Sequence, residues 1–242
     1  MPHSLVTDLY GQMSLPVICA PMFIVSNPKL VVAQCTSGIV GAFPALNARP
    51  QSLLTDWLDE VQAGLASYRE ANPDAKVAPF AVNQIIHQSN DRLDQDLAVC
   101  ASHRVPLVIT SLRAPGDLVK GIHDWGGKVF HDVTTLRHAE KALEAGVDGL
   151  ILVCAGAGGH AGTTSPFALI QEIREWFDGP VALSGAIAAA PALTIAALNG
   201  TADLDLTAGG ALAGQLRART DHGDGAADRD VGALGGRPSR GQ

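Results

Sequence analysis

Seven short apolar runs alternate with longer amphipathic stretches as far as residue 184 of the chain. The runs cover residues 15–20, 39–43, 76–82, 105–110, 128–133, 149–154 and 181–184. Each is apolar nearly throughout and carries its polar residues mainly at its ends, which is typical of a strand buried on both faces of a parallel sheet. The alternation predicts a series of βα units.

The stretches between these runs carry helix start and stop signals. Asn27-Pro28 and Ser165-Pro166 each offer a capping side chain followed by proline, which is favoured at the first helical position. Apolar residues recur at helical spacing from Leu136, and Gly146 follows that stretch as a stop signal. They recur at the same spacing after Ser165.

Seven such units, with an eighth needed for closure, predict a TIM-type (β/α)8 barrel. At 242 residues the chain has the length of one such domain. The eighth strand has to come from residues 202–207, where Asp203 and Asp205 interrupt the apolar pattern. An open doubly wound sheet is the alternative architecture.

The end of the chain differs in composition from the rest. Residues 215–242 contain six glycines, five arginines and four aspartates, and no aromatic residue. Such a stretch buries too little apolar area to offset its ordering entropy. We therefore expect a barrel over residues 1–204 and a low-complexity, disordered tail over residues 205–242.

Composition excludes several classes of function. The chain is 47% apolar and has a net charge of −7, which favours a soluble protein and gives no support for nucleic-acid binding. No apolar run approaches the roughly 20 residues that cross a bilayer, and no secretion signal precedes the first run, so we expect a cytoplasmic protein without membrane contact. The four cysteines contain no C-x-x-C pair, so no metal site is predicted.

The chemistry of an α/β barrel lies on the loops that follow its strands. After the first run comes the uncharged segment Ala20-Pro21-Met22, which suits a flat apolar ligand or an ordinary turn. After the third run Asn83, His87 and Asn90 are either ligand contacts or helix-capping residues. After the fifth run we expect His131, Asp132 and Thr134 on the same rim, where Asp132 accepts from His131 or, the safer interpretation, caps the next helix.

The sixth run leads into Cys154-Ala-Gly-Ala-Gly-Gly-His160-Ala-Gly162. Small residues after a buried strand let a ligand approach the backbone, and exposed amides there bind phosphate. The imidazole of His160 suits proton transfer at neutral pH. One unit later, Ser184-Gly185 follows the seventh run, where barrels commonly bind phosphate. Together these two loops predict a phosphorylated cofactor.

These residues resemble the nitronate monooxygenase (2-nitropropane dioxygenase) family of FMN-dependent TIM barrels. The resemblance lies in residues 16–22, 82–90, 105–111, 130–133, 145–162 and 183–187, in that order. It implies that Ala20, Pro21 and Met22 line the flavin by backbone contacts and that Asn83 bonds the ring or ribityl chain. It further implies that Gly158 and Gly159 border the cofactor and that Ser184 and Gly185 hold its phosphate.

The resemblance also implies an activity. His160 would be the catalytic histidine, either removing the α-proton of a nitroalkane or stabilising the nitronate, which O2 converts to a carbonyl compound and nitrite. The expected partners are a small nitro compound and O2, and a homodimer stays open. Three alternatives remain: an NAD(P)H-dependent flavin reductase of a quinone or enoyl thioester, an inactive truncated relative, and a flavin-free phosphosugar-binding barrel. The truncated relative is considered because the likeness stops near Ala188, beyond which the sequence departs from the family pattern.

Overall fold

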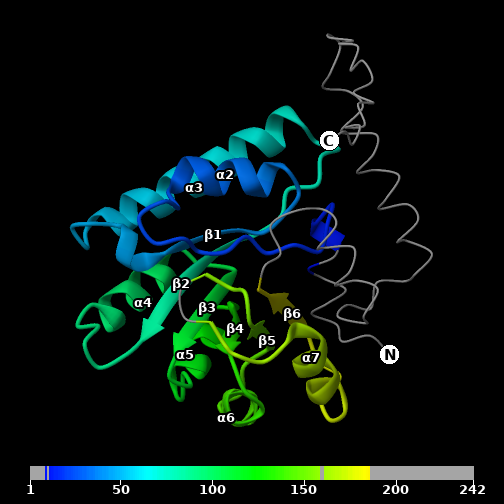
Figure 1. Cartoon of the computed structure of the whole chain (residues 1–242). Coiled ribbons are helices and arrows are strands. Elements are labelled where there is room, and N and C mark those ends of the chain that lie inside the picture. The colour runs from blue at the N-terminus through cyan, green and yellow to red at the C-terminus, as the bar shows by residue number, and fades with distance from the viewer. Residues whose placement is uncertain (1–8, 10, 159–160, 186–242) are drawn as a thin grey trace, which may run out of the picture. The chain divides into compact units, whose positions relative to one another are not determined.

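A computed structural model describes residues 9, 11–158 and 161–185 of the chain. In these residues six parallel strands form one sheet, whose spatial order β1-β2-β3-β4-β5-β6 is the order of the sequence (Figure 1). The strands are β1 (Gly41–Pro44), β2 (Phe80–Ile86), β3 (Leu107–Leu112), β4 (Lys128–Val133), β5 (Gly149–Val153) and β6 (Val181–Ser184).

Helices alternate with these strands along the chain. They are α2 (Pro28–Thr36), α3 (Leu53–Ala71), α4 (Leu93–Ser102), α5 (Leu118–Asp124), α6 (Leu136–Glu144) and α7 (Pro166–Arg174), with a short 3-10 helix η1 (Ala45–Asn47) directly after β1. Figure 1 shows α4, α5, α6 and α7 following one another around the outside of the strands.

The predicted helix signals have mixed outcomes. Asn27 caps α2 as expected, since its Oδ1 accepts from the amide of Leu30 at 3.1 Å. Ser165 precedes α7 but its side chain makes no capping hydrogen bond. Gly146 ends the α6 turn as expected. Its φ is +85°, a backbone conformation that glycine adopts freely and that strains every other residue type.

The strand order confirms the TIM-type barrel class, because a doubly wound sheet reverses its order where this sheet does not. The described strands form a half-barrel. The first expected strand, residues 15–20, forms only an isolated parallel bridge between Ile18 and Val40, which extends the same order before β1. The expected eighth strand at residues 202–207 lies outside the described residues.

Alternate residues of the strands pack on opposite sides. The larger apolar cluster lies between the sheet and the helices and includes Val82, Val108 and Leu150. A smaller cluster fills the barrel side, which we call the interior face. It contains Met13, Val40, Ala42, Ala78, Ala81, Leu107, Ile109 and Phe130. Because side chains alternate along a strand, a residue lies on the same face as the cluster residue two positions before or after it.

A buried ion pair fixes the loop after β1. Asp96 on α4 is fully buried and accepts from Arg92 Nη2 at 3.1 Å. The same guanidinium donates to the carbonyls of Ala48 at 2.8 Å and Ala45 at 3.3 Å. These contacts hold η1, which ends at Asn47, against α4.

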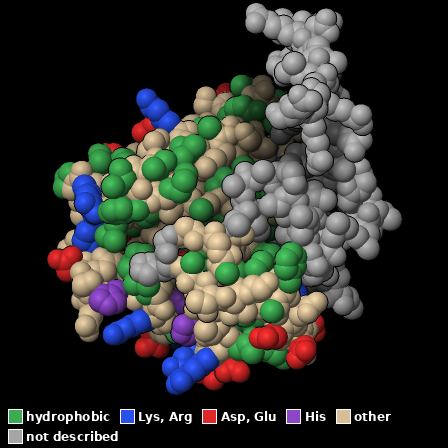
Figure 2. All heavy atoms as spheres, in the orientation of Figure 1, with side chains coloured by type: hydrophobic (Ala, Val, Ile, Leu, Met, Phe, Trp, Pro, Cys, Tyr) green, Lys and Arg blue, Asp and Glu red, His purple; other side chains and the backbone are tan. Residues whose placement is uncertain are grey.

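Two compact units divide the chain, residues Met1–Asp203 and Leu204–Gln242. Every residue of the second unit lies outside the described ones, so the expected tail over residues 205–242 stays a prediction. On the face of the first unit drawn in Figure 2, acidic and basic side chains are interspersed along the lower edge. None of the described helices is both long and apolar enough to cross a membrane.

Candidate active site

Three polar residues follow the interior cluster at the carboxyl ends of successive strands. Asn83 comes two residues after Ala81, and Ser111 two residues after Ile109. Asp132 likewise comes two residues after Phe130. Since side chains alternate along a strand, all three lie on the interior face at the rim where α/β barrels bind their ligands.

A hydrogen-bond chain joins these three side chains. Asn83 Nδ2 donates to Ser111 Oγ at 2.8 Å and to the carbonyl of Ile109 at 3.1 Å. Ser111 Oγ in turn donates to Asp132 Oδ2 at 2.5 Å. The chain thus links the ends of β2, β3 and β4, and it includes Asn83, the residue predicted to bond the flavin.

Asp132 has neither role considered for it from the sequence. Its partner is Ser111 rather than His131. The cap of α6 is Thr135, whose hydroxyl accepts from the amide of His138 at 3.3 Å. Burial raises the pKa of Asp132 to about 6, and the hydrogen bond from Ser111 opposes that increase. Asp132 is therefore a carboxyl group on the interior face that titrates near neutrality.

The prediction that His131 projects from the rim is wrong. Its side chain lies on the opposite, helix-facing side of β4, where it is 2% exposed and bonded to Thr110 Oγ1 at 2.8 Å. Alternation along the strand explains the difference, because His131 and Asp132 are neighbours in sequence and so lie on opposite faces. Thr134, the third of these residues, bonds His138 Nδ1 at 3.0 Å.

Ala20, Pro21 and Met22 lie in an exposed loop that one asparagine holds. Asn47 Nδ2 donates to the carbonyls of Met22 at 3.0 Å and Ser26 at 2.9 Å. Its Oδ1 accepts from the amide of Ile24 at 3.1 Å, a residue with a φ of +68°. Three bonds therefore fix a loop conformation that a β-branched residue rarely adopts. The sequence analysis did not single out Asn47.

The glycine-rich loop is described only in part, because Gly159 and His160 lie outside the described residues. A Cβ on Gly158 would meet no atom within 4 Å, so open space adjoins this residue. A Cβ on Gly162 would lie 2.6 Å from the carbonyl oxygen of Val153, which requires glycine there. The role predicted for His160 thus stays a prediction.

Ser184 is the last residue of β6 and Gly185 follows it, beside this loop. The amide of Cys154 donates to the carbonyl of Ser184 at 2.9 Å. Gly185 has a φ of +130°, and a Cβ there would lie 3.1 Å from the carbonyl oxygen of Ala155. The two strand ends predicted to hold a phosphate are therefore adjacent, and glycine is required at the second.

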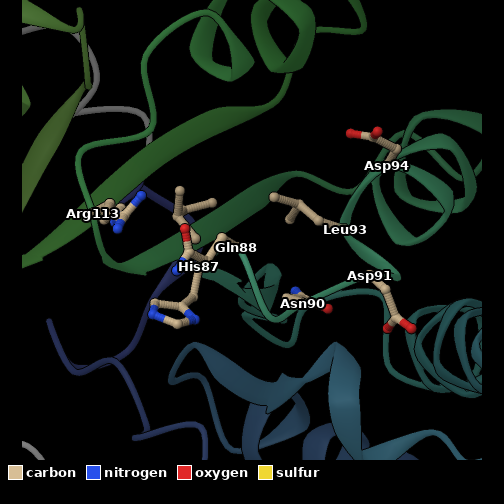
Figure 3. Close-up of a pocket in the computed structure, with 8 residues that line it drawn as sticks. His87, Gln88, Asn90, Asp91, Leu93, Asp94 and Arg113 are labelled. Carbon is tan, nitrogen blue, oxygen red and sulfur yellow. The ribbon is translucent and has the colours of Figure 1, made fainter.

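A pocket of about 380 Å³ opens beyond the ends of β2 and β3 (Figure 3). It is lined by Ile86, His87, Gln88, Asn90, Asp91, Leu93, Asp94 and Arg113. None of the predicted cofactor residues lines it. Asn90 is a loop residue here, since its Nδ2 donates to the carbonyl of Ile85 at 2.9 Å. His87 Nδ1 bonds Ser89 Oγ at 2.7 Å.

The comparison with protein families decides the classification. Residues 4–203 match the family described as nitronate monooxygenase. The chain belongs to the nitronate monooxygenase family. A search of the curated proteins finds no match to this chain.

Two solved structures of other proteins share the fold of this chain. FabK from Thermotoga maritima matches with a TM-score of 0.69 at 24% identity, covering 83% of this chain and 60% of that protein. A nitroalkane oxidase from Streptomyces ansochromogenes matches with a TM-score of 0.69 at 22% identity, covering 81% of this chain and 64% of that protein. The chain therefore spans less than two thirds of the length of either protein.

Proposed function

We propose that this chain is an FMN-dependent enzyme that oxidises nitronates, including those formed from nitroalkanes, with O2 to a carbonyl compound and nitrite. Membership of the nitronate monooxygenase family over residues 4–203 is the observation that carries this proposal. The fold neighbour described as a nitroalkane oxidase is consistent with it.

The described residues fit a flavin on three counts. Both hydrogens of the Asn83 amide are used within the protein, while its Oδ1 has no hydrogen-bond partner among the described residues. Open space adjoins Gly158, which leaves room for a planar group. Gly185 directly follows β6 in a conformation that requires glycine, next to the end of β5. Each of the three features is compatible with a bound flavin.

We assign the individual roles from the family resemblance, and the described positions are compatible with them. Ala20, Pro21 and Met22 would contact the ring through a backbone that Asn47 holds in place. Gly158 and Gly159 would border the cofactor, and Ser184 and Gly185 would bind its phosphate. When bound, FMN supplies the redox chemistry and the reaction with O2.

His160 is the residue that we assign to proton transfer. It directly follows Gly158-Gly159 in the sequence, and an imidazole is the side chain best suited to proton transfer at neutral pH. With a neutral nitroalkane it would remove the α-proton. With a preformed nitronate it would instead stabilise the negative charge on the nitro oxygens.

The competing proposal is an NAD(P)H-dependent flavin enzyme that reduces a quinone or an enoyl thioester. FabK and the nitroalkane oxidase match this chain with equal TM-scores of 0.69, so likeness in fold does not decide between the two proposals. The description of the matching family is our reason for preferring the nitronate as substrate.

The experiment is reconstitution with FMN followed by desalting and assay. We expect a visible flavin band that stays with the protein, together with nitrite release and oxygen uptake when a nitronate is added. A desalted protein without flavin, or a flavin-loaded protein that releases no nitrite, would contradict the proposal.

A further inference from the structure

The hydrogen-bond chain through Asn83, Ser111 and Asp132 has one direction, and a backbone atom sets it. The carbonyl oxygen of Ile109 can only accept, so the amide nitrogen of Asn83, rather than its oxygen, must face it at 3.1 Å. The second hydrogen of that nitrogen goes to Ser111 Oγ at 2.8 Å. Ser111 accepts this bond and therefore directs its own hydrogen to Asp132 Oδ2.

The direction of the chain determines what Asn83 offers to a ligand. With both N–H groups used, the amide presents only Oδ1, which accepts no hydrogen bond from any described residue. A pure acceptor binds only a donor. An oxidised isoalloxazine ring carries a single N–H group, the imide N–H, whereas its other polar ring atoms accept.

We propose that Ser111 and Asp132 are positioning residues of the cofactor site, which hold the Asn83 amide so that its Oδ1 accepts from the imide N–H of the flavin. This inference rests on the proposed function. It assigns roles to two residues that lie on β3 and β4, away from the glycine-rich loop.

The surroundings of Asp132 support a task of this kind. The residue beside it on β5 is Ile151, and its neighbour His131 lies on the other face of β4. On α6, His138 bonds Thr134. No described cation pairs with Asp132, and Ser111 is its hydrogen-bond donor. A part-buried carboxylate without a cation costs free energy, so packing alone does not account for it.

The ionisation of Asp132 strengthens the chain. Burial raises the pKa of Asp132 to about 6, so the group is mainly ionised at pH 7.5. A hydrogen bond to an ionised acceptor is stronger than one to a neutral acceptor. Ser111 is therefore held firmly in the orientation that accepts from Asn83.

The test is a thermodynamic cycle that compares two proteins, each with two flavin ligands. The wild type and Ser111→Ala are titrated with FMN and with FMN methylated at the imide nitrogen, and the dissociation constants are measured from flavin fluorescence. In the wild type we expect methylation to weaken binding about tenfold, the equivalent of one hydrogen bond. In Ser111→Ala we expect weaker FMN binding and a methylation effect below about threefold.

Controls separate positioning from general damage. Asp132→Asn keeps the shape and can still accept from Ser111 through a neutral oxygen, so we expect a smaller loss of affinity, about twofold to threefold. Ser102→Ala removes a hydroxyl that donates to Val99 at the exposed end of α4, and it should leave the cycle unchanged. Circular dichroism of each unliganded variant establishes that it is folded. Should Ser111→Ala fail to fold, the same cycle is run with Asp132→Asn, where a methylation effect that shrinks supports the proposal.

The outcomes are distinct. The roles of Ser111 and Asp132 are overturned if the methylation effect in Ser111→Ala, or in Asp132→Asn where Ser111→Ala does not fold, equals that of the wild type. They are also overturned if the wild type shows no methylation effect while it binds FMN. Failure of the wild type to bind either flavin overturns the proposed function, and this inference with it.

Discussion

The imidazole of His131 lies with Nδ1 2.8 Å from the hydroxyl oxygen of Thr110, on the helix-facing side of β4. Burial is the main cause that lowers the pKa of His131 to about 4, from an ordinary value of 6.5, and nearby His138 adds to it. The folded protein therefore favours the neutral ring. The resulting stability is present above pH 6.5 and is lost as the pH falls through 4, by roughly 3 kcal/mol in total.

Asp132 acts in the opposite direction. Its pKa is raised from 3.8 to about 6, so its contribution to the free energy of unfolding is full below pH 3.8 and is lost as the pH rises through 6. Between pH 6 and pH 4 the two residues therefore offset each other. We predict that Asp132→Asn loses stability more steeply than the wild type over this interval, as measured by urea unfolding at several pH values. Equal slopes would contradict the two assignments.

Replacing Gly185, after β6, and Gly158, in the loop after β5, should affect stability and flavin affinity differently. Gly185→Ala places a methyl group 3.1 Å from the carbonyl oxygen of Ala155 at a φ of +130°, so we expect the unliganded protein to lose about 1–3 kcal/mol. Gly158→Ala places its methyl group in open space, so stability should stay the same while flavin affinity falls. Thermal unfolding and flavin titration measure the two effects.

Gly121→Ala is the matched control for these glycines. It lies in α5, and its added methyl group also meets nothing within 4 Å. Alanine favours a helix over glycine, so this variant should unfold slightly later and bind flavin as the wild type does. If Gly158→Ala likewise leaves flavin affinity unchanged, the cofactor does not border Gly158.

Asn47→Ala should loosen the loop that contains Met22. It removes three hydrogen bonds, including the one to the amide of Ile24. We expect a loss of stability of about 1–3 kcal/mol and a flavin affinity about tenfold lower. Asn72→Ala is the control, because it removes a single exposed bond to the carbonyl of Tyr68. An Asn47→Ala variant that binds flavin normally would show that this loop does not contact the cofactor.

His160→Asn tests the assigned base. We predict that turnover on neutral nitroalkanes falls by a factor of about a hundred to ten thousand, the usual cost of removing a positioned base, while FMN stays bound. Steady-state kinetics on the neutral nitroalkane and on its preformed nitronate separate the two roles. Equal and large losses on both substrates indicate charge stabilisation, and unchanged activity on the neutral form excludes His160 as the base.

Much of the fold could be predicted from the sequence because strands buried on both faces are continuously apolar. Six of the seven expected runs are strands. The bounds of β4 and β6 are those expected, and β1 and β5 each have an end within one residue of the expected one. The run at residues 15–20 pairs only through Ile18, since a continuous ladder requires partners that periodicity does not specify. The barrel prediction already implied a sequential strand order, and the structure decides between that order and the doubly wound alternative.

The site residues could be predicted where their chemistry follows from residue type. The prediction failed where the role of a residue depends on the face of the strand that it occupies. Asn83 was identified at a strand end, whereas Ser111 was noticed only as part of a family motif. Alternation along the strand, applied to His131 and Asp132, would have placed one on each face. Asn47 gave no signal, because its partners are backbone atoms of a loop 21–25 residues away.

The most direct test of the account is the response of the bound flavin to two reductants without oxygen. FMN-loaded protein is mixed anaerobically with a nitronate, and separately with NADH or NADPH, while the visible absorption of the flavin is followed. The account predicts that the nitronate changes the flavin spectrum and that the nicotinamides do not. Bleaching by a nicotinamide without any response to the nitronate would contradict it and would identify the chain as a flavin reductase instead.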